Sequence, residues 1–191
     1  WYMYLAVIAA GLFAGFVNTL AGSGSLITLP LLMFLGLPAN IANGTNRIGV
    51  FVQSLVSSVS FKKQKLYTVG ESLWMSVPAI AGALLGSLIA VKINERMMEL
   101  LIGGLLVFMF FIILYKPEQW VRDHAHSAAM KRRWWVPVMF FVIGIYGGFI
   151  QAGVGFFLLA ALVLGTGMGL TRANAHKVLI VAAMTAIALV V

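Results

Sequence analysis

The chain has 191 residues, of which 62% are hydrophobic and 9% charged, with a mean hydropathy of +1.02. Soluble domains are roughly 45–50% apolar and about 25% charged, so this composition excludes a soluble enzyme, a disordered chain and a soluble nucleic-acid binder. The net charge of +8 therefore indicates basic loops on the cytoplasmic side of a membrane, and no nucleic-acid partner is expected. The absence of cysteine excludes disulfides and thiolate metal ligands. We expect an all-α, polytopic transmembrane bundle.

Long runs with few charges predict the helices in chain order. About 20 apolar residues cross the roughly 30 Å hydrocarbon layer of a bilayer, and four runs have the length of a single crossing. They are predicted near 40–61, 72–92 and 97–115, and from about 173 onward. Asn94 is placed to cap the third of these helices, with Glu95 in its first turn.

The runs 2–36 and 134–165 are too long for one crossing and too short for two complete ones. Each contains a Gly-rich interruption, Ala21-Gly22-Ser23-Gly24-Ser25 in the first and Gly153-Val154-Gly155 in the second. We predict a broken helix or a re-entrant hairpin in each run. Non-helical backbone at membrane depth survives only where protein covers it or where it lines a polar cavity. Close packing of helices at small residues is the alternative.

The two interrupted runs belong to an internal repeat. Residues 11–47 align with 144–180 at a constant offset of 133 and without a gap. Paired interruptions in two halves are typical of the binding site of a secondary transporter. The repeat predicts three regions along the chain, namely a first membrane repeat over 1–117, a cytoplasmic connector over 118–133 and a second, incomplete repeat over 134–191.

The equivalents of residues 70–115 would fall near 203–248, so we expect the last spans of the second repeat to be missing from this chain. The halves are inverted if both interrupted runs re-enter, and parallel if each crosses once; we favour inversion. Eight positive charges in the connectors 62–70 and 116–133, against two in 92–96, place the first two connectors in the cytoplasm.

Three strings surround the first interruption, and parts of them recur in the second half. The first-half strings are Ala21-Gly22-Ser23-Gly24-Ser25-Leu26-Ile27-Thr28-Leu29-Pro30, Gly36-Leu37-Pro38-Ala39-Asn40 and Gly44-Thr45-Asn46-Arg47, and the second-half parts are Gly147-Gly148-Phe149, Gly155 and Ala173-Asn174-Ala175-His176-Lys177. In order and spacing, over nearly the whole chain, they resemble the sulfite exporter TauE/SafE family.

The resemblance implies about eight hydrophobic segments in two halves, embedded in the prokaryotic cytoplasmic (inner) membrane as a multi-pass protein. It also implies secondary transport of small anions, often export of sulfite, sulfonates or other sulfur-containing acids. The family's first interruption is often a pure Gly run, whereas Ser23 and Ser25 interrupt it here. The identity of the anion is therefore not carried over from any one relative.

An anion needs hydrogen-bond donors and a positive potential, and the N-termini of half-helices supply both. The candidate substrate-binding residues lie at the two interruptions, which we expect to approach each other near the middle of the membrane, and on the helix starts around them. They are Asn18, Gly22, Ser23, Gly24, Ser25, Asn43, Thr45, Arg47, Gln151, Gly153, Gly155, His176 and Lys177. The alternative is that the polar side chains bond neighbouring helices and that the cations extend to the interface.

His176 could carry a coupled proton, because imidazole titrates near neutrality, or it could be a bonded polar residue at a helix start. No carboxylate lies in the interior of a predicted span, since Glu99 falls in the first turn of the span near 97–115, and this favours an anion over a cation as the substrate. The string Asp123-His124-Ala125-His126 is interpreted as a solvated loop, so neither a metal nor a cofactor is expected. An intramembrane enzyme and a non-transporting assembly subunit are the competing functions, and the oligomeric state stays open.

Overall fold

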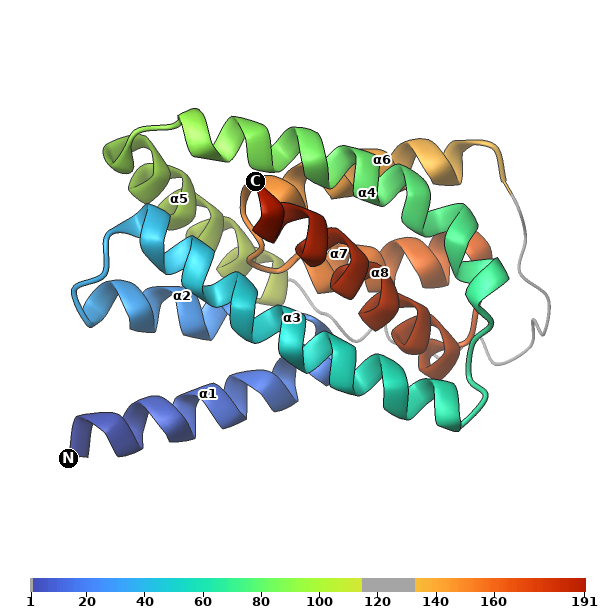
Figure 1. The fold of residues 1–191 in the computed structure, drawn as a ribbon, viewed down its shortest axis with the longest axis horizontal. Helices are drawn as coiled ribbons and strands as arrows, with labels where there is room; N and C mark the ends of the chain where they lie inside the picture. Colours follow the sequence, from blue (N-terminus) through green and yellow to red (C-terminus); the bar gives the residue numbers. More distant parts are fainter. Residues whose placement is uncertain (1, 115–132) are drawn as a thin grey trace.

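A computed structural model describes residues 2–114 and 133–191, and every regular element in that part of the chain is a helix. Figure 1 shows them as one bundle of roughly aligned helices. In chain order they are α1 (Tyr2–Ala21), α2 (Ser25–Phe34), α3 (Ala39–Lys63), α4 (Val69–Lys92), α5 (Glu95–Leu114), α6 (Trp135–Phe149), α7 (Val154–Ala160), the π-helix η2 (Ala161–Thr166) and α8 (Leu170–Val190).

The four predicted single spans are present as α3, α4, α5 and α8. By length and composition, α4 and α8 are the two helices in the described residues that could cross a membrane alone. Asn94 caps α5 as predicted, because its Oδ1 accepts a hydrogen bond from the Met97 amide at 2.9 Å. The predicted connector over 118–133 lies outside the described residues except for Arg133, as does the string from Asp123 to His126.

Both long runs are interrupted, as predicted. The first run breaks between α1 and α2, and the second breaks between α6 and α7. Figure 1 shows α2 turning back from the end of α1, which makes the first run a hairpin. The offset of 133 matches the outer ends of the two hairpins within about two residues. The second break, however, begins five residues earlier than the offset predicts, because α6 already ends at Phe149.

The equivalent helices α3 and α8 run in opposite directions (Figure 1). Arg47, near the start of α3, donates a hydrogen bond to the carbonyl of Ala188, near the end of α8. Antiparallel contact between equivalent helices is what an inverted repeat predicts, and a parallel repeat would place their starts together. The arrangement of these helices is therefore inverted.

The closest packing in the fold lies between α4 and α6. Gly82 and Gly86 of α4 face Gly144 and Gly148 of α6 at the four-residue spacing that lets helix backbones touch. A Cβ atom at Gly144 would lie 3.0 Å from the Cα of Ala79, so no larger residue fits without separating the helices. The main buried cluster includes Met75 of α4 and Phe140 of α6 beside this contact, and it continues to Leu158 of α7, Leu162 of η2 and Ile180 of α8.

Candidate functional site

The two breaks meet at Gly22 and Gly155, which the offset of 133 makes equivalent. A Cβ atom added at Gly22 would lie 2.5 Å from the Cα of Gly155, and one added at Gly155 would lie 2.5 Å from the Cα of Gly22. Gly22 also has a φ of +75°, which L-residues with a side chain rarely adopt. Both requirements call for glycine, and the predicted approach of the two breaks is present in the structure.

The start of α2 is held by a polar side chain of α3. Asn46 donates from Nδ2 to the hydroxyl of Ser25 at 3.0 Å, and its Oδ1 accepts a hydrogen bond from Thr28 at 2.5 Å. The first-turn amides of a helix have no acceptor within the helix. The second and third amides of α2 bond back to carbonyls of the break, so the donors left at this point are the amides of Ser23, Gly24 and Ser25, at the positive end of the helix dipole.

A second pair of amides holds the end of α1. Asn18 donates to Gln53 Oε1 at 2.6 Å, and Gln53 in turn donates to the hydroxyl of Thr19 at 2.6 Å. The equivalent residue of Asn18 is Gln151, which donates to Thr185 of α8 at 2.5 Å. Gln151 is buried, and its Oε1 is among the buried side-chain atoms without a hydrogen-bond partner. Each broken helix thus carries an amide side chain bonded to a long helix.

A cleft of about 260 Å³ lies between α1, α2 and α3. Its apolar part contains Val7, Leu31 and Leu32, and its polar residues are Asn18, Ser25, Thr28, Thr45, Asn46 and Gln53. Where the two breaks touch, by contrast, the space beside Ser25, Gln151 and Lys177 is about 10 Å³, which holds one water at most. A separate cavity of about 370 Å³ is lined in part by Asn43 and Arg47. Beside the two breaks, the open volume therefore belongs to the cleft of the first hairpin.

Arg47 does not line this cleft. It is 5% exposed, and its guanidinium donates to the carbonyls of Gly148 and Phe149, the last two residues of α6. Asn43 adds a hydrogen bond to the Phe149 carbonyl at 3.0 Å. A cation at the C-terminal end of a helix neutralises unpaired carbonyls and the negative end of the dipole. Arg47 and Asn43 thus hold the end of α6.

Lys177 makes the reciprocal contact in the other half. Its side chain is 1% exposed, and Nζ lies 3.3 Å from the Asn18 carbonyl and 3.2 Å from the Thr19 carbonyl in the last turn of α1. Under the offset, Arg47 would correspond to residue 180, and Lys177 precedes that position by three residues. Asn18 would correspond to residue 151, and Gly148 also precedes it by three. Relative to the offset of 133, both partners of the second-half contact are therefore shifted by three residues, or about one helical turn.

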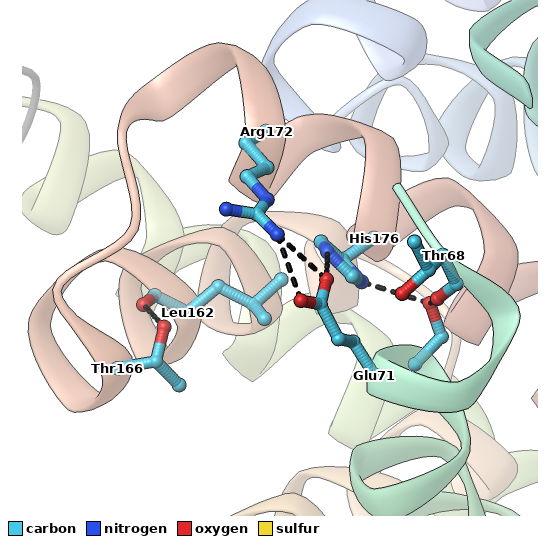
Figure 2. Close-up of polar contacts among 7 residues, drawn as sticks. Thr68, Glu71, Leu162, Thr166, Arg172 and His176 are labelled. Carbon is cyan, nitrogen blue, oxygen red and sulfur yellow. Dashed lines mark hydrogen bonds and ion pairs between the residues drawn. The ribbon is translucent and has the colours of Figure 1, made fainter. Parts of the chain in front are cut away.

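His176 lies apart from the breaks, at the start of α8 (Figure 2). Its Nδ1 is 2.8 Å from the hydroxyl of Ser72, and its Nε2 is 3.7 Å from a carboxylate oxygen of Glu71. Arg172 binds both oxygens of that carboxylate, at 2.9 and 2.7 Å. The structure therefore separates His176 from the other candidates and joins it to α4.

The remaining candidates divide between the two breaks. Gly24 and Thr45 line the cleft, Ser23 lies within the first break, and Gly153 turns the second break with a φ of +72°. In the described residues no three His, Cys, Asp or Glu side chains gather as a metal site would require.

The sequence interpretation missed Asn46, Gln53, Glu71 and Arg172. Asn46 could have been found, since it follows Asn43 by three residues and both therefore lie on the buried face of α3. Glu71 lies one residue outside the span predicted near 72–92, but α4 begins at Val69 and therefore includes it. No pattern in the sequence pairs it with Arg172, which is 101 residues away.

Comparison with known proteins matches residues 7–191 to the model of the family described as sulfite exporter TauE/SafE. A probable membrane transporter protein, ORF9, of Sinorhizobium is 27% identical over 92% of this chain and 67% of its own length. A probable membrane transporter of Haemophilus influenzae is 25% identical over 90% and 67%, and the probable membrane transporter YfcA of Escherichia coli K12 is 26% identical over 87% and 61%. The chain thus spans about two thirds of the length of these relatives. No solved structure matches.

Proposed function

Because the chain belongs to the sulfite exporter TauE/SafE family, a family of membrane transporters, we propose that it carries small anions such as sulfite, sulfonates or other sulfur-containing organic acids across the prokaryotic cytoplasmic membrane, in the export direction. The observation that carries this proposal is the start of α2, where helix amides and the side chains of Ser25, Thr28 and Asn46 border an open cleft. Neutral donors at a helix N-terminus bind anions without a matched cation.

In this proposal the direct ligands are the amides of Ser23, Gly24 and Ser25, together with Asn18 and Thr45 at the cleft. Gln151, Gly153 and Gly155 become ligands when the second break moves away from Gly22. Arg47 and Lys177 are bound to helix carbonyls, so they contribute positive potential and hold the breaks in place.

The proposal includes a multi-pass arrangement in the inner membrane, with the connector between α3 and α4 in the cytoplasm. Single cysteines suit a test because the chain has none of its own. A cysteine replacing Lys63 should react with an impermeant thiol reagent from the cytoplasmic side only. Labelling from outside intact cells would contradict this topology. We further propose that the flux is coupled to protons through His176.

Anion binding is best tested by adding one negative charge at the start of α2. Asn46→Asp keeps the shape of the side chain but should weaken sulfite or sulfonate binding by about tenfold or more, because like charges a few ångströms apart repel by about 1–4 kcal/mol. Asn40→Asp is the matched control, since Asn40 starts the same helix outside the cleft. Binding is measured by thermal stabilisation and flux in proteoliposomes. Equal affinity in both variants would overturn the site.

A further inference from the structure

Four side chains join α4 to α8 at one end of the bundle, and we call them the α4–α8 cluster: Glu71, Ser72, Arg172 and His176 (Figure 2). Glu71 and Ser72 belong to the first half of the chain, and Arg172 and His176 belong to the second. Glu71 and Arg172 have side chains about one-third exposed, at 33% and 35%, whereas His176 is 0% exposed. The cluster therefore leads from an accessible carboxylate to a buried imidazole.

The contacts of the Ser72 hydroxyl indicate which imidazole nitrogen carries a proton. Ser72 Oγ has one proton to donate, and it lies 3.1 Å from the carbonyl of Thr68 and 2.8 Å from His176 Nδ1. Because a carbonyl can only accept, both contacts are hydrogen bonds only when Ser72 donates to Thr68 and the imidazole donates from Nδ1. On this ground we assign the proton of neutral His176 to Nδ1, which leaves Nε2 as an unprotonated acceptor.

That acceptor has nothing to accept from. His176 Nε2 is buried and makes no hydrogen bond, and the atom it faces is a carboxylate oxygen of Glu71 at 3.7 Å. Two acceptors facing each other in a buried place are unfavourable. A proton on Nε2 turns the same pair of atoms into a charge-assisted donor and acceptor.

The other groups around the imidazole do not supply this proton. The ring of Tyr67 lies 5.8 Å from the imidazole, but its hydroxyl contacts the side chain and the carbonyl of Ser58. Arg172, one turn before His176 on α8, donates to both oxygens of the Glu71 carboxylate. Among the described residues, the charged groups that face His176 are therefore Glu71 from α4 and Arg172 from α8.

We propose that the α4–α8 cluster is a proton-binding site in which Glu71 receives a proton from the aqueous side and passes it to Nε2 of His176. The carboxylate is regenerated in this step, the Nδ1 proton stays on the ring and remains hydrogen-bonded to Ser72 Oγ, and the product is an imidazolium beside a carboxylate. Glu71 is then shared between His176 and Arg172, which loosens one of two contacts that Arg172 makes to it. As a coupling step this rests on the proposed transport function, but proton binding itself does not.

The test is nitrogen NMR of the whole protein in lipid nanodiscs with labelled histidine, the signal of His176 being assigned by its loss in His176→Asn. At about pH 8 we expect the neutral ring with its proton on Nδ1, and a growing population of the doubly protonated ring as the pH is lowered. Glu71→Gln should reduce the ratio of protonated to neutral His176 by about tenfold at a fixed pH. Glu95→Gln is the matched control, since Glu95 is exposed at the start of α5.

Ser72→Ala tests the positioning of the ring separately. Without the hydroxyl, neutral His176 should lose its single form and populate both proton positions, a change that mere loss of packing would not produce. A proton on Nε2 at about pH 8 in the unchanged protein, or equal protonation in Glu71→Gln and Glu95→Gln, would overturn the site. If His176 titrates as expected but no anion flux is found, the proposed function fails and the proton site stands.

Discussion

The two hairpins differ in what covers them. The second hairpin, α6 with α7 and η2, is packed against α4 through Gly144 and Gly148, and a Cβ at Gly148 would lie 2.6 Å from the Cα of Ala83. In the first hairpin the equivalent residues Gly11 and Gly15 have no described atom within 4 Å of an added Cβ. The neighbouring Leu12 is 73% exposed.

Within the described residues, the same small-residue pattern contacts α4 in one half and has no neighbour in the other. A pattern of glycines allows close approach, but a neighbouring helix decides whether the approach happens. Under the offset of 133, the helix equivalent to α4 would fall near 202–225, among the spans that we expect to be missing from this chain. In the present chain, therefore, we expect substitutions at the contact of α6 with α4 to affect stability more than substitutions at the equivalent positions of α1.

The largest expected effect comes from filling the contact of α6 with α4. Gly148→Leu should lower the free energy of unfolding by several kcal/mol, about 3 or more, since the backbone of Ala83 cannot yield as a side chain can. Gly15→Leu at the equivalent position should change it by about 0.5 kcal/mol or less. Reversible unfolding in mixed micelles measures both, and equal losses would remove the contrast between the hairpins.

The next prediction compares the cost of a left-handed backbone conformation with the cost of breaking a backbone contact between the two breaks. Gly22 and Gly36 both have positive φ, +75° and +90°, but only Gly22 touches another backbone. Gly36→Ala should cost about 1–2 kcal/mol from the left-handed conformation alone. Gly22→Ala should cost about 2 kcal/mol more. If the two variants unfold alike, the contact of Gly22 with Gly155 contributes nothing.

Removing each buried cation compares the two reciprocal contacts. Arg47→Met should cost about 2–4 kcal/mol, because it leaves the last carbonyls of α6 without their charged donor. Lys177→Met should cost about 1–2 kcal/mol, since its contacts to the end of α1 are longer. Thermal unfolding ranks the pair, and Arg47→Lys should recover part of the loss. A reversed ranking would show that the first hairpin is the firmer one.

The smallest effect on stability is expected from two threonines. Thr28→Val in the first hairpin should change the free energy of unfolding by about 1 kcal/mol or less but weaken anion binding, since Thr28 orients Asn46 at the cleft. Thr185→Val should cost about 1–2 kcal/mol by leaving the buried amide of Gln151 unpaired, with a smaller loss of affinity than in Thr28→Val, because Gln151 is a ligand only after the second break moves. Calorimetry and unfolding together check both, and an equal loss of affinity in the two variants would contradict this order.

The fold could be predicted from the sequence because its strongest constraints are local. Runs of membrane length with few charges predict α3, α4, α5 and α8, and the glycines at the interruptions predict the two breaks. The offset of 133 correctly brought Gly22 and Gly155 together. The offset did not predict where α6 ends, because the end of a helix before a break depends on tertiary contacts such as that of Arg47 with Gly148.

The candidate site was predictable only in part, because its pairings span large distances along the chain. The cleft residues near the first break follow from the Gly and Ser pattern, but the bonding of Arg47 to the end of α6 does not. A single Arg at a helix start is compatible with a ligand, an interface or a distant helix end. Choosing among them requires the three-dimensional neighbours of its side chain.

The reciprocal contacts of Arg47 and Lys177 also impose an order in time. Arg47, which binds the end of α6, is synthesised 102 residues before Phe149. Lys177, which binds the end of α1, is synthesised 158 residues after Thr19. At about 5–20 residues per second, the end of α1 is synthesised roughly 8–30 s before its cation. The end of α1 can thus pair with Gln53 of α3 soon after it is made, but it waits for most of the synthesis of this chain before its charged donor is present.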